Sequence, residues 1–327
     1  MRVKQRAPYI YHQESTRAVM VDIILALLGV YAICFYYYGQ RVLYLGLACV
    51  LTCVLCDGAS VLLMRRRILL NDLSPVVTGL IIPLLFPASI DFFVPVLASL
   101  FGIIVAKAAF GGTGHNVFNP AAVGFGFAVS CFPTRIFTYP APGQATIDPL
   151  PMFPAPGDFA TMPSPGFILN VGGIPAYDLE EMLLGNFPGP MGATNILVIL
   201  ACLLYLVFRR AIKWEIPVFF LLFCALLAFF FPRAPMDGIT SIMYETMSGM
   251  LLFGGVFMIG DPVTSPGRSW CRIAYAAAVA AAVMFFRHYG RFEDSFVFVL
   301  LAMNATVWGF DMLGELAASK IRRWKRE

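Results

Sequence analysis

The sequence is dominated by long, leucine-rich apolar runs that only short polar or Pro/Gly-containing breaks separate. The first run, Val19 to Tyr38, has the roughly 20 residues that a helix needs to cross a bilayer. Hydrophobic residues make up 59% of the 327 residues and charged residues only 13%, against about 25% charged residues in soluble proteins. The sequence therefore predicts an all-α integral membrane protein and excludes a large additional soluble domain.

Ten apolar windows are predicted to span the membrane, in two groups of five that one long loop separates. The predicted spans are residues 19–38, 42–63, 74–88, 92–110, 117–132, 194–208, 215–231, 240–259, 270–286 and 294–313. The predicted organisation is a cytoplasmic N-terminal segment (1–18), a first five-helix half (19–132), a Pro-rich extracytoplasmic loop (133–193), a second five-helix half (194–313) and a basic cytoplasmic tail (314–327).

The distribution of Lys and Arg predicts which side each connection faces, because these residues collect in cytoplasmic connections. With the N-terminus inside, 18 of the 23 Lys and Arg residues fall on the cytoplasmic side and five on the outside. A wrong span count would reverse this imbalance partway along the chain. The partition therefore favours ten spans and cytoplasmic N- and C-termini.

The third and fifth predicted spans are short and interrupted. Pro75, Pro83 and Pro87 punctuate the third, and Asn119-Pro120 opens the fifth. Interrupted helices at membrane depth are tolerated only where the freed backbone groups face protein, a cavity or a ligand. The pattern is typical of transporter-like folds with internal binding sites, and two five-span halves would be inverted relative to each other.

Residues 133 to 192 hold 12 of the 23 prolines and a single basic residue, Arg135. Because proline disrupts helix interiors, no regular helix is expected in this loop. A loop this long is usually functional or disordered, although a simple solvated connection fits its composition equally well.

The motif GGTGHNVFNPA covers residues 111–121 and is predicted on the cytoplasmic side. Asn116 and Asn119 are three residues apart, so one helical face would present both amides, which suit the polar edge of a planar heterocycle. The alternative, which the chemistry alone favours, is that the asparagines cap the fifth helix and the glycines form a turn.

Asp261, in the motif GDPVTSP, follows the eighth span on the same predicted face. A carboxylate at the edge of the hydrocarbon region is costly without a partner. The partner is Arg268, the backbone of the turn, or a ligand N–H beside Asn116 and Asn119; capping of the turn is favoured on the sequence alone.

Thr194 lies in the motif PGPMGATN, which closes the long loop on the outside. Gly192 and Ala193 are predicted to leave its hydroxyl sterically open at a helix N-terminus, where N–H groups and the helix dipole favour a phosphate. The simpler alternative is that Thr194 is an N-cap and that small residues begin a membrane helix.

No catalytic side chain and no metal site is predicted. The eight cysteines lie almost entirely in apolar runs, and the CxxC motif from Cys53 to Cys56 has no histidine nearby. Asp22, Lys107 and Glu245 fall within or near predicted spans, where each is either part of an ion or proton relay or a paired charge. The sequence does not decide between these roles.

The three motifs GGTGHNVFNPA, GDPVTSP and PGPMGATN, together with the segments from Thr78 to Ser89 and from Leu300 to Asn304, resemble one family across nearly the whole chain. It comprises the RnfD subunits of the Rnf respiratory complex and the similar NqrB subunits of the sodium-pumping NADH:quinone reductase. The resemblance implies a flavin-carrying membrane subunit of a complex that couples electron transfer between ferredoxin and NAD to Na+ or H+ translocation.

The resemblance also implies two cofactors. FMN is expected to be esterified through its phosphate to Thr194, beside Gly192 and Ala193, by a separate flavin transferase. A second, noncovalent flavin, expected to be riboflavin, matches Asn116, Asn119 and Asp261. Met191 and Pro188 depart from the serine or threonine and the aspartate that are common at such attachment sites.

The expected location is the bacterial cytoplasmic (inner) membrane. The chain has no nucleotide-binding loop or cysteine cluster, so partners are expected to supply the NAD and iron–sulfur chemistry. The resemblance implies that these partners are other membrane and peripheral subunits of the Rnf complex, including a second flavin-bearing subunit and iron–sulfur subunits. No nucleic acid partner is expected, and the chain is not expected to be catalytic alone. The alternatives are a solute channel or secondary transporter without flavin, and a structural scaffold. The coupling ion and the direction of electron flow do not follow from the sequence.

Overall fold

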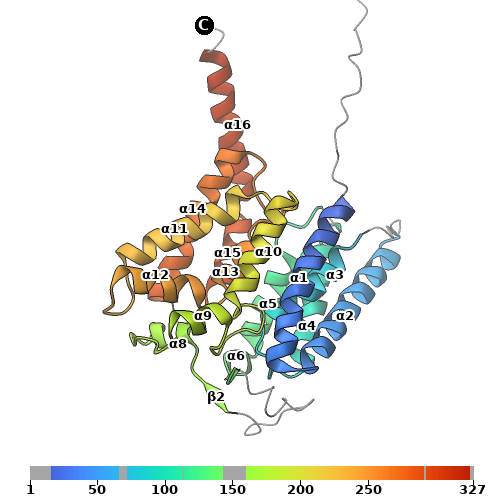
Figure 1. The fold of residues 1–327 in the computed structure, drawn as a ribbon. Coiled ribbons are helices and arrows are strands. Elements are labelled where there is room, and N and C mark those ends of the chain that lie inside the picture. The colour runs from blue at the N-terminus through green and yellow to red at the C-terminus, as the bar shows by residue number, and fades with distance from the viewer. Residues whose placement is uncertain (1–15, 66–71, 113, 143–159, 291, 325–327) are drawn as a thin grey trace, which may run out of the picture.

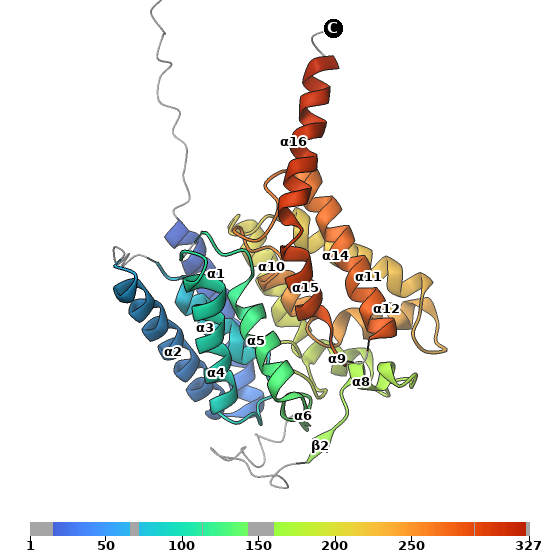
Figure 2. The same cartoon turned by 180° about the vertical axis from the view of Figure 1, so that it is seen from behind.

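The computed structural model describes residues 16–65, 72–112, 114–142, 160–290 and 292–324. These residues form a bundle of helices with a small two-stranded sheet at one end, as Figures 1 and 2 show from opposite sides. The predicted class, an all-α membrane protein with broken helices, is confirmed.

The first half consists of two long helices followed by shorter ones. They are α1 (Thr16–Tyr38), α2 (Arg41–Leu63), α3 (Ser74–Leu84), α4 (Phe93–Phe101), its π-helical continuation η1 (Gly102–Ala108) and α5 (Pro120–Cys131). Helix α3 contains Pro83 one residue before its end. Helix α5 has Asn119 as its N-cap and proline at its first position, where no hydrogen bond is lost. The prediction that the third and fifth spans are short is confirmed.

The second half has two breaks that the sequence did not predict. Its helices are α10 (Ile196–Phe208), α11 (Glu215–Phe230), α12 (Gly238–Met247), α13 (Leu251–Phe257), α14 (Ser269–Tyr289), α15 (Phe296–Asn304) and α16 (Val307–Trp324). The eighth predicted span is interrupted between α12 and α13, where Ser248 is extended and Gly249 has a φ of 64°. The tenth is bent by 48° between α15 and α16. Neither segment contains proline, so the usual signal of a helix break is missing.

The loop between the halves is more regular than expected. It contains α6 (Pro133–Ile136), β1 (Tyr139–Pro140), β2 (Thr161–Met162), α8 (Pro165–Asn170) and α9 (Leu179–Leu184), while residues 143–159 lie outside the described residues. The expectation of no regular helix was wrong, because α6 and α8 both begin with a proline, and proline is tolerated in a first turn. Ser164 caps α8, and Asp178 and Glu181 form a capping box on α9.

Three helices, α1, α2 and α14, are individually long and apolar enough to cross a membrane, and α15 with α16 forms a bent fourth candidate. Shorter apolar helices of 10–17 residues occupy five other predicted spans. Each of the ten predicted spans contains helix, but the number of crossings stays a prediction.

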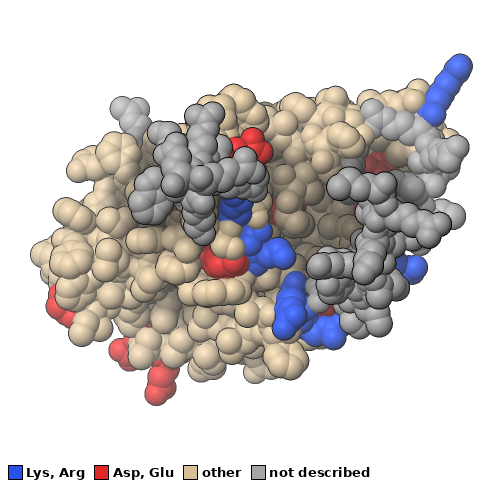
Figure 3. All heavy atoms as spheres, turned by 90° about the horizontal axis from the view of Figure 1, so that it is seen from above, with Lys and Arg blue, Asp and Glu red and all other residues tan. Residues whose placement is uncertain are grey.

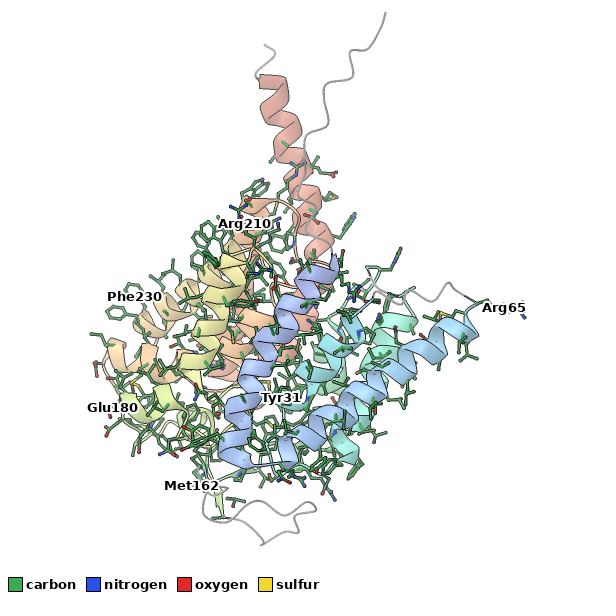
Figure 4. The ribbon with its side chains drawn as sticks, turned by 45° about the vertical axis from the view of Figure 1, so that its right-hand side comes forward. Tyr31, Arg65, Met162, Glu180, Arg210 and Phe230 are labelled. Carbon is green, nitrogen blue, oxygen red and sulfur yellow. The ribbon has the colours of Figure 1, made fainter. Side chains whose placement is uncertain are left out.

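The two halves lie side by side and meet where α1 packs on α10 and α5 on α15. Within the halves, α2 packs on α3, α4 on α5 and α11 on α14. Large side chains such as Phe86, Phe125 and Phe253 are fully buried between the helices. Tyr31, labelled in Figure 4, donates from its hydroxyl to the carbonyl of Leu80 at 3.0 Å and ties α1 to α3.

The molecule has two distinct ends. In Figure 1, α1 begins and α16 ends at the top, whereas β2 and α8 lie at the bottom. In Figure 4, Arg210 lies toward the first end and Met162 toward the second. We call them the termini end and the loop end. This arrangement agrees with the prediction that the loop and the two termini lie on opposite sides; which end faces the cytoplasm stays a prediction.

Candidate functional site

A cavity opens at the termini end between the two halves of the molecule. Its open volume, including the part continuous with solvent, is about 800 Å³. Figure 3 views this end and shows a recess beside gathered basic side chains. The walls come from α1, α3, η1 and the start of α5 on one side, and from α10, α13 and the turn after α13 on the other. The polar lining side chains are those of Ser74, Thr78, Lys107, Asn116, Asn119 and Asp261.

Asn119 lines this cavity and also caps α5. Its Oδ1 accepts from the backbone N–H groups of Ala121 at 3.0 Å and Ala122 at 3.2 Å. Its Nδ2 donates to the carbonyl of Met258, at the end of α13, at 3.4 Å. The side chain, 5% exposed, therefore fixes the start of α5 against the second half while it forms part of the cavity wall. The capping alternative is confirmed for this residue.

Asn116 lines the same cavity but does not lie on a helix. It precedes α5, and its Nδ2 donates to the carbonyl of Phe118 at 3.3 Å. The expectation that one helical face presents both amides was wrong, because Pro120 makes α5 begin only after Asn119. Gly111, Gly112 and Gly114 have φ values of 116°, 96° and 86°, which only glycine adopts readily. The glycines form the predicted turn, and this turn brings Asn116 to the cavity.

Asp261 lies in the turn after α13 and lines the same cavity as the two asparagines. Its Oδ1 accepts from the backbone N–H of Val263 at 3.1 Å, so it caps the turn. Arg268 does not pair with it and donates to the carbonyl of Gly314 instead. Burial raises the pKa of Asp261 above its usual value, which the hydrogen bond from Val263 partly offsets.

Lys107 is a polar wall residue whose role the sequence left open. Its Nζ lies 2.9 Å from Asp57 Oδ1 and 3.2 Å from Asp72 Oδ2, and donates to Ser74 Oγ at 2.9 Å. The side chain is 4% exposed, so the two carboxylates offset the cost of burying its charge. It lies in the π-helical turn η1, and π-helical turns are frequent at functional sites. Lys107 stands out in the sequence as a charge within an apolar run. Its carboxylate partners are 35 and 50 residues away, so no pattern in the neighbouring sequence indicates the pairing.

The cavity matches the chemistry of an isoalloxazine ring. Small-molecule sites combine apolar walls with a few convergent polar groups, and this cavity has both. Ile23, Leu206 and Phe257 contribute apolar surface. Amide donors and acceptors and a carboxylate face the same space, which suits a planar ring with alternating carbonyl and N–H groups. The residues present therefore fit a noncovalent flavin.

Thr194 lies at the loop end, in a tightly packed turn. The backbone N–H of Met191 donates to the carbonyl of Phe86 at 3.0 Å, and that of Gly192 to the carbonyl of Leu84 at 2.9 Å. An added Cβ on Gly192 would lie 2.5 Å from Leu84 Cβ, so glycine is required for this contact. The turn is thus held against the end of α3.

The hydroxyl of Thr194 is not open as expected. Thr194 is 2% exposed and hydrogen-bonds the hydroxyl of Tyr38. It is not the N-cap either: Asn195 caps α10, and its Oδ1 accepts from the N–H of Val198 at 3.0 Å. The small residues Gly192 and Ala193 allow close packing here and do not provide access. A phosphoryl group therefore cannot reach the hydroxyl unless the segments that cover it move.

The other two charges left open by the sequence are paired. Asp22 Oδ1 lies 3.2 Å from Arg209 Nε and accepts from the hydroxyl of Tyr205 at 3.0 Å, which joins α1 to α10. Glu245 forms salt bridges with Arg233 and Arg287. Of Asp22, Lys107 and Glu245, only Lys107 lines the cavity.

The chain is similar over its length to a known membrane family. The model of the NQR2, RnfD, RnfE family matches residues 3–317. One relative is the D subunit of the Na(+)-translocating ferredoxin:NAD(+) oxidoreductase complex of Acetobacterium woodii. The chain is 30% identical to it over 302 residues, which cover 91% of this chain and 89% of that protein.

Two further relatives are the D subunits of complexes named ion-translocating oxidoreductase. The one from Stutzerimonas stutzeri is 30% identical over 322 residues, covering 90% of this chain and 89% of the relative. The one from Pectobacterium atrosepticum is 29% identical over 334 residues, covering 92% and 93%. The similarity therefore extends across both halves and the loop between them.

Proposed function

The chain belongs to the NQR2, RnfD, RnfE family, and we propose that it is the flavin-carrying membrane subunit of an ion-translocating oxidoreductase complex. Its relatives are named as subunits of such complexes, and the complex of one of them is a Na(+)-translocating ferredoxin:NAD(+) oxidoreductase. The proposed activity of the complex is electron transfer between ferredoxin and NAD coupled to Na+ or H+ translocation. The chain supplies one segment of the electron path and is not catalytic alone.

One observation carries the flavin part of the proposal: Asn116, Asn119 and Asp261, from two separate motifs, line the same cavity. A bound flavin would supply one- and two-electron redox chemistry, while the protein provides position, polarity and insulation. The amides and the carboxylate hold the polar edge of the ring. Apolar residues such as Ile23 and Phe257 exclude water from its faces. The expected ligand is riboflavin, which is what the family resemblance implies for this position.

The second flavin is proposed at the loop end, as FMN esterified to Thr194. A threonine hydroxyl is a poor nucleophile without an adjacent base, and here it is buried against Tyr38. Attachment therefore needs an external flavin transferase that acts while the turn around Gly192 and Ala193 is open. The two sites lie at opposite ends of the molecule, so flavins held at Thr194 and in the cavity would provide redox chemistry on the two sides of the membrane.

We place the chain in the bacterial cytoplasmic membrane with the termini end inside. The 18 to five partition of basic residues supports this orientation. The proposed partners are the other membrane and peripheral subunits of the complex, among them a second flavin-bearing subunit and the iron–sulfur subunits. Alkaline phosphatase fused in the loop at Met162 is expected to be active, and fused after Arg65 inactive; the reverse pattern would contradict the orientation.

The test of the function separates two pools of flavin. The chain is expressed with and without a flavin transferase, purified and denatured in acid. Riboflavin is expected in the soluble extract in both cases, and a fluorescent protein band in denaturing gels only with the transferase. A dark band with no extractable flavin, together with solute flux in proteoliposomes, would favour a channel or transporter instead.

A further inference from the structure

Five charged side chains gather at the loop end of the second half. Arg233 lies between α11 and α12, Glu245 on α12 and Arg287 on α14, while Glu293 and Asp294 lie in the turn before α15. Glu245, Arg287 and Asp294 are nearly fully buried, and the side chain of Arg233 is 5% exposed. Glu293 is only partly buried. This cluster is remote from the cavity at the termini end.

The four buried charges balance one another. Arg233 Nη2 donates to Glu245 Oε2 at 2.9 Å, and Arg287 Nη1 lies 3.3 Å from the same oxygen. Arg287 Nη2 lies 3.7 Å from Asp294 Oδ2, and Asp294 Oδ1 accepts from the backbone N–H of Phe296 at 3.0 Å. Two guanidinium groups and two carboxylates leave no net charge. Within the described residues, both guanidinium groups are thus already paired with Glu245 and Asp294.

The break in the eighth span is shaped around this cluster. An added Cβ on Gly249 would lie 2.4 Å from Asp294 Oδ2 and 3.0 Å from Arg287 Nη2. Among the described residues, Ser248 Oγ, Ser295 Oγ and Arg287 Nε are buried without a hydrogen-bond partner. Buried polar atoms of this kind usually have a hydrogen-bond partner, so these three are exceptions within a densely charged region.

Glu293 is the fifth charged side chain of the cluster. Within the described residues, no Lys or Arg forms a salt bridge with it; Arg291 lies outside the described residues. Its partners are hydroxyl groups of the loop: Ser164 Oγ donates to Glu293 Oε1, and Tyr139 hydrogen-bonds it. An added Cβ on Gly166 would lie 3.7 Å from Glu293 Cγ. The loop segments around β1 and α8 therefore cover this side chain.

The groups that face Glu293 act in opposite directions on its ionisation. Burial raises the pKa of Glu293 to about 7, and the negative charge of Asp294 adds to this rise. The hydroxyls of Ser164 and Tyr139 and the charge of Arg287 oppose it. Burial under the loop outweighs the favourable contacts, because hydroxyl groups offset only part of the lost hydration of a carboxylate.

We propose that Glu293 binds one exchangeable proton at the loop end and that this proton favours the docked position of the loop segments around Tyr139 and Ser164. The proton comes from the solvent at that end and converts the carboxylate to a neutral carboxyl. Since the docked loop covers part of Glu293 and reduces its hydration, the docked state binds the proton more tightly than a state with the loop displaced. By linkage, the free energy that favours docking decreases as the pH rises from the usual pKa range of a glutamate to the raised pKa of Glu293. At higher pH it no longer changes.

Two measurements on the purified full chain test this site. Infrared titration is expected to show a protonated carboxyl that disappears with a midpoint near pH 7 and is absent in Glu293→Gln. Hydrogen exchange of α8, corrected for intrinsic rates, is expected to lose protection by up to about tenfold per pH unit between about pH 5 and 7. Glu293→Gln keeps the low-pH protection throughout, because the amide mimics the neutral carboxyl.

Two variants make the result specific. Glu180→Gln removes an exposed acid from the same loop and is expected to leave both titrations unchanged. Tyr139→Phe removes a hydroxyl that favours the ionised form and is expected to move the infrared midpoint to higher pH, which tests the site even if Glu293→Gln does not fold. A carboxyl midpoint unaffected by both Glu293→Gln and Tyr139→Phe would overturn the proposal, as would equal pH dependence of α8 protection in wild type and Glu293→Gln.

Discussion

The cavity at the termini end and the Thr194 turn at the loop end are built on opposite principles. Around the cavity, helix ends and glycine turns hold Asn116, Asn119 and Asp261 at the edge of an open space. Around Thr194, small residues bring backbone into direct contact, and the hydroxyl is 2% exposed. A ligand that comes and goes needs the first arrangement. A group that is attached once can be placed by the second, provided that the turn opens for the attachment.

The largest expected effect is at the loop end. Thr194→Ala is expected to abolish the fluorescent gel band in cells that express the flavin transferase, because alanine has no hydroxyl to esterify, whereas Thr194→Ser retains part of the label. Extractable riboflavin should stay unchanged, since the cavity is at the other end.

Asn195→Ala is the matched control for this prediction. It removes the cap of α10, at a cost of about 0.5–2 kcal/mol, but keeps the acceptor hydroxyl and therefore the label. Mass spectrometry of peptides from both variants locates the flavin. A flavin mass on any peptide of Thr194→Ala would mean that the attachment site is elsewhere.

A pair of glycine substitutions measures how differently the two regions are packed. A Cβ on Gly192 would lie 2.5 Å from Leu84 Cβ and 2.9 Å from Leu84 O, whereas nothing lies within 4 Å of a Cβ on Gly260 beside the cavity. Gly192→Ala is expected to destabilise by about 1–3 kcal/mol through overpacking. Gly260→Ala should change stability by less than about 0.5 kcal/mol. Thermal unfolding in detergent compares the two, and equal shifts in the midpoint would show that the Thr194 turn is not closely packed.

The same contrast explains what the sequence predicted and what it did not. Local signals were sufficient for the helix in each apolar run and for the start of α5, where Asn119-Pro120 combines a cap with a first-turn proline. The burial of Thr194 depends on Tyr38, which is more than 150 residues away. The sequence around Thr194 cannot predict a contact between residues so far apart. The break at Ser248-Gly249 lacks proline, and the side chains of Arg287 and Asp294 that lie close to Gly249 are also far away in the sequence.

The candidate cavity shows the same limit. The chemistry and spacing of the asparagine pair and of Asp261 single these residues out in the sequence, but their meeting in one space is a property of the fold. Lys107 was visible as a charge in an apolar run, but its position in the wall depends on the π-helical turn η1 and on carboxylates from α2 and the segment before α3. The sequence therefore locates these groups and allows for pairing, but it does not identify their partners.

Two asparagine substitutions separate ligand binding from structure within the cavity. Asn119→Ala is expected to lower extractable riboflavin and also to destabilise by about 0.5–2 kcal/mol, because it removes the cap of α5. Asn116→Ala is expected to lower riboflavin with a smaller loss of stability, since its amide makes a single bond of 3.3 Å to Phe118. Flavin extraction and thermal unfolding on the same preparations give both quantities. If Asn116→Ala retained all riboflavin, this amide would only shape the turn.

The smallest expected effect is the pH dependence contributed by Asp261. Burial raises its pKa in the folded protein, so the native state holds a proton at a pH where the unfolded chain has lost it. Stability is then expected to fall as pH rises from the usual range of an aspartate through the raised value, and to be level above it. Asp261→Asn cannot ionise and should lack this fall.

A bound ligand is expected to change the pH dependence that Asp261 contributes. A ligand N–H donates preferentially to the carboxylate, which favours the ionised form, so bound riboflavin opposes the effect of burial. Thermal midpoints between about pH 4 and 7 should therefore depend less on pH in flavin-loaded protein than in stripped protein, and an identical dependence in the two would mean that Asp261 caps its turn without touching the ring.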